Sequence, residues 1–84
     1  MPVFRLHIRE QNELVHDLEG EELPSLEKAV EEAIAGLRSV AADCLIAGRK
    51  FTLKGIVISD EGGTALREVT AAEAIALVIS ADLD

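Results

Sequence analysis

The side chains of this sequence that could carry acid–base, nucleophilic or metal chemistry are few and widely spaced. They are two histidines, one cysteine and four serines: His7, His16, Cys44, Ser25, Ser39, Ser59 and Ser80. Zinc ligands and catalytic nucleophiles need partners that converge, and short motifs often reveal them. The sequence has no G-x-S-x-G motif, no G-x-G-x-x-G motif and no P-loop. We therefore expect no catalytic residue, no cofactor and no metal site.

The two histidines lie on segments whose alternating apolar and polar residues predict β-strands, over residues 3–9 and 13–18. Residues 10–12 predict a three-residue turn between them. This loop length gives a register with the pairs Phe4–Leu18, Leu6–His16, Ile8–Leu14, Arg5–Asp17 and Arg9–Glu13. His7 and His16 then lie on opposite faces, so we predict a structural role for each. A shift of one residue would bring them face to face.

A long helix is predicted after this hairpin, with Ser25 as its N-cap and Glu27 in a first turn that favours negative charge. Apolar residues at spacings of three and four predict its buried face: Leu26, Val30, Ala33, Ile34, Leu37, Val40, Ala41, Cys44 and Leu45. Gly48 ends the helix, which is then about 22 residues and ~33 Å long. On this face Cys44 is predicted to be a buried, unreactive side chain.

Two more strands are predicted over residues 51–60 and 65–69, joined by a turn at Asp60-Glu61-Gly62-Gly63. Thr70 and Glu73 form a capping box for a short helix from Ala71, with a strand over residues 75–79 as the alternative. The fold class is then α+β, with the order β-β-α-β-β-α in one domain of residues 1–84. We expect a four-stranded antiparallel sheet of order 2-1-3-4, with the long helix on one face.

The composition limits what such a domain can be. It has 84 residues, a net charge of −8, one cysteine and no Trp or Tyr, so an intrachain disulfide is excluded and nucleic acid is not an expected partner. Short chains often gain stability from a partner, and we expect a homodimer through the exposed sheet face and the apolar C-terminal segment. No stretch resembles a signal peptide or a membrane span of ~20 apolar residues. We therefore expect a cytoplasmic protein without membrane association.

The negative charge is confined to one part of the chain. Residues 10–32 hold nine acidic residues and one basic residue, while the other residues are balanced. The predicted topology gathers six acidic residues at one end of the sheet: Glu19, Glu21, Glu22, Glu27, Asp60 and Glu61. A solvated end that aids solubility is the commonest explanation, and a docking surface for a basic protein is the functional one. A third explanation is a divalent-cation site from Asp17, Glu19 and Asp60.

Three stretches of the sequence resemble a family of small alphaproteobacterial proteins classed as a domain of unknown function. The family opens M-P-x-[FY]-x-[FY]-H, seen here as residues 1–7 with Leu6 in place of an aromatic residue. A D-x-E-G-x-E-L-P-[DS]-L-E run is seen as residues 17–27, and a D-E-x-G hairpin as residues 60–63. The first turn departs from the family, which often has Asp-Gly where Glu10-Gln11 stands here. The resemblance covers residues 1–76 and implies a bacterial, cytoplasmic, single-domain protein, without an activity.

Taken together, the sequence favours a small non-enzymatic protein-interaction module with an acidic end that meets a basic partner. A small-ligand binder, or an enzyme with its site at a dimer interface, is one alternative. An antitoxin-like or regulatory protein is another, by analogy with other small β-β-α units.

Overall fold

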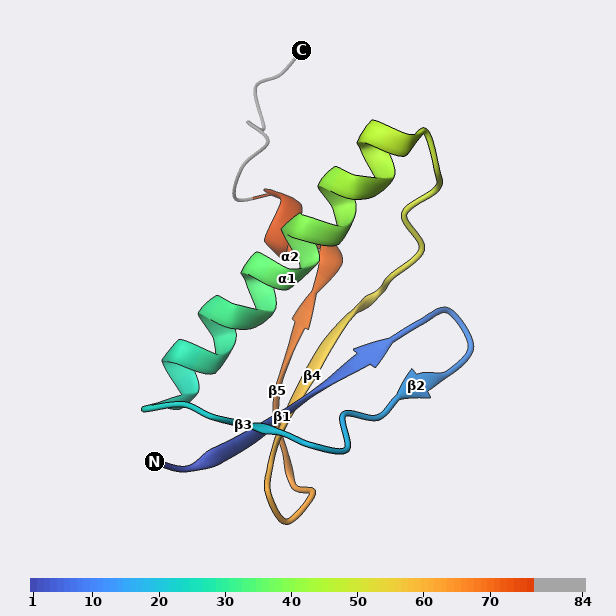
Figure 1. Cartoon of the computed structure of the whole chain (residues 1–84). Coiled ribbons are helices and arrows are strands. Elements are labelled where there is room, and N and C mark those ends of the chain that lie inside the picture. Colours follow the sequence, from blue (N-terminus) through green and yellow to red (C-terminus); the bar gives the residue numbers. More distant parts are fainter. Residues whose placement is uncertain (77–84) are drawn as a thin grey trace.

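The computed structural model describes residues 1–76 and confirms a mixed α+β arrangement (Figure 1). A long helix crosses one face of an antiparallel sheet, and a short helix follows the last strand. In chain order the elements are β1 (Val3–Arg9), β2 (Leu14–Val15), β3 (Glu21–Glu22), α1 (Leu26–Ala47), β4 (Gly55–Asp60), β5 (Ala65–Thr70) and α2 (Ala71–Ala76). Within these residues no helix is both long and apolar enough to cross a bilayer.

The sheet has five strands, in the order β2-β1-β4-β5, with β3 also paired to β1. The predicted four-stranded sheet of order 2-1-3-4 is therefore wrong. The third and fourth predicted strands correspond to β4 and β5, but β4 begins at Gly55 rather than at residue 51. Residues 51–54 form no strand, although the Lys54 amide still donates to the Arg9 carbonyl (2.8 Å).

The error lies in the predicted strand over residues 13–18, of which only Leu14–Val15 forms a strand, β2. After a bulge at residues 16–20 the chain returns to the edge of β1 as β3. Each short strand pairs with one end of β1, through Ile8–Val15 and Arg9–Leu14 for β2, and through Val3–Glu22 and Phe4–Glu21 for β3. Residues 16–20 leave the middle of β1 without a strand partner on this edge. The predicted three-residue turn is also wrong, because residues 10–13 form the loop and shift the register by one.

Both predicted ends of α1 are confirmed. The Oγ of Ser25, the N-cap, accepts the Lys28 amide (3.1 Å), and Glu27 lies in the first turn. Gly48 closes the helix with a φ of +70°, and the following amide, from Arg49, donates to the carbonyl of the last turn at Cys44 (2.9 Å). These caps set a helix of 22 residues.

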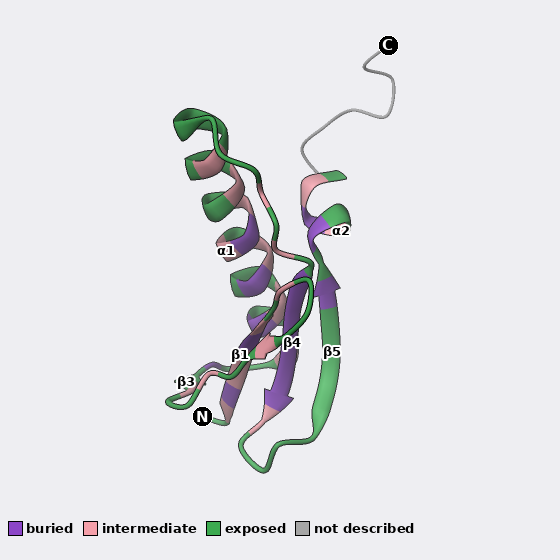
Figure 2. Cartoon of the chain, turned by 90° about the vertical axis from the view of Figure 1, so that its right-hand side faces the viewer, coloured by how far each residue is buried: buried purple, intermediate pink, exposed green. Residues whose placement is uncertain are grey.

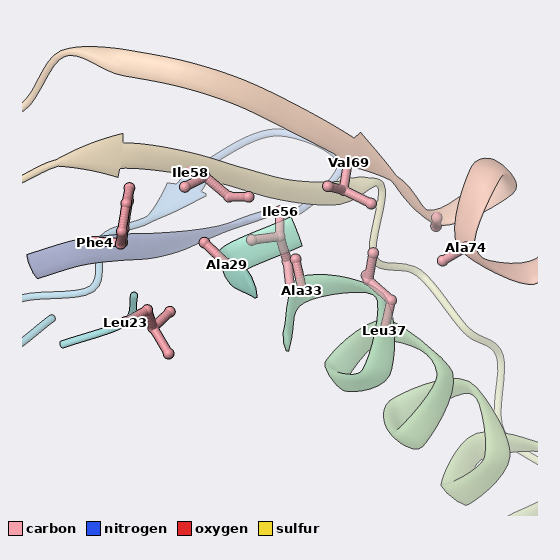
Figure 3. Close-up of a cluster of buried hydrophobic side chains, with 10 residues drawn as sticks. Phe4, Leu23, Ala29, Ala33, Leu37, Ile56, Ile58, Val69 and Ala74 are labelled. Carbon is pink, nitrogen blue, oxygen red and sulfur yellow. The ribbon is translucent and has the colours of Figure 1, made fainter. Parts of the chain in front are cut away.

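The core lies between α1 and the sheet face that this helix covers (Figure 3). Small side chains on α1 let the helix approach the sheet closely, and Leu37 fills the space beside them. Each large apolar side chain buried here stabilises the fold by roughly 1.5–3 kcal/mol. The buried residues of this core are Ala29, Ala33 and Leu37 on α1, Ile56 and Ile58 on β4, Val69 on β5, and Ala71 and Ala74 on α2, with Phe4 and Leu23 at the β3 end.

The C-terminal half of α1 extends past the sheet and is exposed (Figure 2). Leu45 is 83% exposed and Ile46 is 86% exposed. The reason is length, since 22 helical residues rise about 33 Å, whereas a six-residue strand rises only about 20 Å. The fully buried stripe therefore ends at Leu37, and the prediction that Cys44 is a core residue is wrong, because this side chain is only half-buried.

The hairpin turn between β4 and β5 and the capping box of α2 are confirmed. The Asp60 carboxylate accepts the Thr64 amide (2.8 Å) within the turn. Thr70 Oγ1 accepts the Glu73 amide (3.0 Å), and the Glu73 carboxylate accepts the Thr70 amide (3.4 Å). Of the alternative strand over residues 75–79, the first two residues are helical and the others lie outside the described residues.

Candidate functional site

The sheet face that α1 leaves uncovered carries a cluster of polar side chains around His7. Alternate residues of β1 point to this face, so Arg5 and Arg9 flank His7 there. The register of β2 places His16 beside His7, with the ring centroids 5.0 Å apart and the ring planes at 70°. The prediction that the histidines lie on opposite faces is therefore wrong, because the loop before β2 is one residue longer than expected.

Asp17 fixes the chain where it leaves β2. Because β2 and β3 pair with β1 on either side of Leu6, the Leu6 amide points to this edge with no strand opposite. The Asp17 carboxylate fills the gap, and its Oδ2 accepts the Leu6 amide (3.1 Å). Its Oδ1 accepts the amides of Glu19 and Gly20 (3.2 Å each). One side chain thus replaces the missing ladder bond and holds the turn that leads to β3.

Gly20 is required in this turn for two reasons. Its φ of +78° is a left-handed conformation that residues with a Cβ adopt at a cost. A Cβ at this position would also lie 2.7 Å from Cγ1 of Val3 and 3.3 Å from the carbonyl oxygen of Phe4. The turn therefore packs directly against β1.

His7 is 8% exposed, and both of its ring nitrogens are hydrogen-bonded. Nδ1 accepts the backbone amide of Asp17 (2.9 Å), so the proton of the neutral ring is on Nε2. Nε2 donates to Ser59 Oγ (2.9 Å), and Ser59 Oγ donates in turn to the Asp60 carbonyl (3.2 Å). His7 therefore links the bulge after β2 to β4 across the face of β1.

The charge states of His7 and Asp17 follow from these surroundings. Burial lowers the pKa of His7, as do the neighbouring His16 and Arg5, against the opposing effect of the Asp17 carboxylate. Burial alone would raise the pKa of Asp17. The backbone amides that donate hydrogen bonds to its carboxylate have a larger combined effect, so the pKa is lowered overall. At neutral pH the pair is therefore a neutral imidazole beside an ionised carboxylate.

Ser59, His7 and Asp17 are the residue types of a catalytic triad, but the proton lies on the wrong nitrogen. A triad histidine accepts the serine proton at Nε2, while a carboxylate accepts the proton on Nδ1. Here Nδ1 accepts a backbone amide, and the protonated Nε2 faces Ser59. This arrangement orients the serine hydroxyl, which donates to the Asp60 carbonyl, but offers it no base.

The same hydrogen bonds leave few side-chain atoms free to coordinate a metal ion. No three His, Cys, Asp or Glu side chains are grouped as metal ligands anywhere in residues 1–76. The Asp17 carboxylate is already bonded to three amides, and the Asp60 carboxylate caps the turn at Thr64. The cation site considered for Asp17, Glu19 and Asp60 therefore does not form in the described part of the chain.

A cleft of about 310 Å³ opens beside the two histidines, where three segments meet. β1, the bulge after β2 and the turn between β4 and β5 supply its walls: Arg5, His7, His16, Glu61, Gly62 and Gly63. A second cleft of about 380 Å³ lies between α1 and β5, with the lining Leu26, Glu27, Val30 and Arg67. The first cleft is lined by a guanidinium, two imidazole rings and one carboxylate, whereas the second is lined mainly by apolar side chains, so the first is the better candidate for a polar ligand.

The six acidic residues singled out from the sequence lie toward one end of the sheet, in and before β3, in the first turn of α1 and in the β4–β5 turn (Figure 1). Glu21 and Asp60 pair with Phe4 from its two sides, so they stand in one row across β1. Asp60 is half-buried and the other five are exposed. We call this set the acidic end: Glu19, Glu21, Glu22, Glu27, Asp60 and Glu61.

Sequence reasoning did not find the cluster of Arg5, His7, His16 and Ser59. The signal that could have found it is the spacing of Asp17 and Gly20, because an aspartate that bonds nearby amides and a glycine at positive φ are typical of a tight turn. A turn beginning at Asp17 ends the preceding strand at about His16. The full alternation over residues 13–18 concealed that turn.

The sequence pattern of one family matches the chain. This family, DUF6894, is described as a domain of unknown function, and the match spans residues 3–72, which include every strand and α1. No curated protein and no solved structure matches the chain. The match thus supplies a family and no activity.

The pKa of His7 predicts how stability depends on pH. The unfolded-state pKa of about 6.5 is higher than the folded-state value, so the unfolded chain binds the proton first as pH falls. The stability that neutral His7 contributes is therefore complete above about pH 6.5 and is lost toward the lower, folded-state pKa. Urea unfolding at pH 7.5 and 5.5 should show this loss in the native chain and little of it in His7→Gln.

His16→Gln is the matched control, because His16 is exposed and its charge lowers the His7 pKa less than burial does. This variant should keep most of the pH dependence, since burial is the largest cause of the His7 shift. An unchanged pH dependence in His7→Gln would show that His7 is not the group that titrates.

Proposed function

The chain belongs to the DUF6894 family, and from this premise we propose that it is a non-enzymatic module that binds a basic segment of a partner protein through its acidic end. The observation that carries the proposal is the absence of cationic partners there. The ion pairs among the described residues are Arg9–Glu68, Lys28–Glu31 and Arg67–Glu73, and none includes a residue of the acidic end. Like charges held together in this way repel one another, and a basic surface would relieve that repulsion.

The hydrogen bonds of the polar cluster support a non-enzymatic role. The one serine–histidine contact in the described residues has its imidazole proton on the nitrogen that faces the hydroxyl. General base catalysis requires a free imidazole nitrogen within reach of the proton that it removes. His7 has none, because its other nitrogen accepts the Asp17 amide.

We also propose that the protein is cytoplasmic and of alphaproteobacterial origin. The origin is supported by the resemblance of residues 1–7, 17–27 and 60–63 to the segments described above. The location is supported by Cys44, a free and half-buried thiol in a chain with no second cysteine. Thiols of this kind are normal in a reducing compartment.

A homodimer is a further part of the proposal. Of the surface expected from the sequence, most of the apolar C-terminal segment lies outside the described residues. The uncovered sheet face is polar and carries the Arg9–Glu68 ion pair, so it suits self-association poorly. Three of the exposed large apolar side chains lie on the C-terminal part of α1, namely Val40, Leu45 and Ile46, while the others among the described residues are scattered: Met1, Val15, Leu18 and Leu66. Pairing of two such helix ends would remove apolar surface from water.

Reversal of charge at the acidic end tests partner binding. The triple variant Glu19→Lys, Glu21→Lys, Glu22→Lys should no longer capture the proteins that the native chain captures from a lysate of its source cell. The control Glu13→Lys, Glu32→Lys, Asp43→Lys changes the net charge equally at exposed positions elsewhere and should keep them. Equal capture by both variants would contradict a role for the acidic end. Capture by the native chain should also weaken as salt is raised.

Light scattering tests the dimer. The native chain should have twice its monomer mass of 9.0 kDa at micromolar concentration. The variant Leu45→Glu, Ile46→Glu should have the monomer mass with an unchanged circular dichroism spectrum, because both side chains are exposed in the single chain. A native chain of 9.0 kDa would rule the dimer out.

A further inference from the structure

The cleft beside the histidines contains a cation that the fold leaves without an anionic partner. The Arg5 guanidinium lines this cleft, and no carboxylate of the described residues lies within ion-pairing distance of it. Its one hydrogen bond is long, from Nη1 to the Leu18 carbonyl (3.4 Å). Its Nε is buried without any acceptor. By contrast, Arg9 and Arg67 each have a carboxylate partner.

A buried donor without an acceptor is rare in folded proteins, and an absent ligand is one of its ordinary explanations. Arg5 is held in place by its neighbours, since the turn at Gly20 packs against its side chain. This contact holds the aliphatic part of the side chain, and the hydrogen bond to the Leu18 carbonyl holds the guanidinium beside the cleft. A preorganised fork of N–H donors is the usual partner of a planar oxyanion.

His16 adds a second donor to the same cleft. Its ring packs on the edge of His7, lines the cleft and makes no hydrogen bond within the described residues. His7 itself cannot serve, because both of its nitrogens are already bonded. The ligand-binding groups are thus Arg5 and His16, and the ring of His7 packs against that of His16.

We propose that this cleft binds a carboxylate, which accepts hydrogen bonds from the Arg5 guanidinium and the His16 imidazole. The negative charge of the residues that line and surround the cleft favours a carboxylate over a phosphate. Glu61 also lines the cleft, and the chain carries a net charge of −8, so a dianion is repelled more strongly than a monoanion. The volume of about 310 Å³ suits a small molecule or the end of a peptide. The cleft shares Glu61 with the acidic end, but the observations on Arg5 and His16 that carry this proposal do not rest on partner binding there.

Nuclear magnetic resonance titration of the full chain tests this proposal. The probe is N-acetylglycine, and the matched control is N-acetylglycinamide, which has the same size without the charge. The carboxylate should give saturable shifts confined to the side-chain N–H of Arg5, the ring of His16 and the amides of Gly62 and Gly63. The amide should give none. Linear shifts, shifts equal to those from sodium chloride, or shifts spread over the surface would overturn the proposal.

Variants make the test specific. Arg5→Gln and His16→Ala should each weaken binding about tenfold, as expected for a lost hydrogen bond to a charged group. Arg49→Gln, at an exposed position outside the cleft, should leave binding unchanged. Glu61→Gln should strengthen binding about twofold, because it removes a repelling charge. If Arg5→Gln unfolds, His16→Ala still decides the matter, and unchanged binding in it would refute the assignment.

Two further probes identify the ligand class. Tighter binding of N-acetylglycine than of acetate supports a peptide C-terminus, and equal binding supports a free small carboxylate. Inorganic phosphate should bind more weakly than either. Tighter binding of phosphate would overturn the assignment to a carboxylate.

Discussion

The arrangement of side chains on the uncovered sheet face depends on which group accepts the hydrogen bond of one backbone amide, that of Leu6. The Leu6 N–H points to the edge of β1 between two short strands, where no strand lies opposite. An amide left without an acceptor there would cost about 1–3 kcal/mol. The Asp17 carboxylate accepts it, and the same side chain accepts two amides of the turn that returns the chain to β3. The interruption of the edge strand is thus stabilised by the residue at which it begins.

The cluster and the cleft follow from that interruption. With Asp17 bonded to β1, its own amide reaches Nδ1 of His7 and fixes the proton of the ring on the side of Ser59. The register of β2 brings His16 against His7, and the bulge after it places the Leu18 carbonyl beside the Arg5 guanidinium. A regular strand over residues 13–18 would have filled this edge with ladder bonds. His16 would still lie opposite His7 in the register of β2, but the turn at Asp17 that forms one wall of the cleft would be absent.

The predictions from sequence were right where local signals agree and wrong where a local bond overrides a pattern. The caps at Ser25 and Gly48, the turn between β4 and β5 and the capping box at Thr70 were all predictable, because each depends on residues close in sequence. The long helix was predictable, but its overhang was not, because that depends on the length of the sheet. The histidine cluster was missed because the alternation over residues 13–18 predicts a regular strand. In the structure, three hydrogen bonds from backbone amides to the Asp17 carboxylate stabilise a turn there instead.

Hydrogen exchange at the Leu6 amide tests this account most directly. In the native chain this amide should be protected as strongly as those of its neighbours in β1, despite having no strand opposite. In Asp17→Asn, where an NH₂ group replaces one of the accepting oxygens, protection of Leu6 should fall by about 10-fold to 100-fold, while amides in the middle of α1 change little. Rapid exchange of Leu6 in the native chain, or equal protection in Asp17→Asn, would contradict the account.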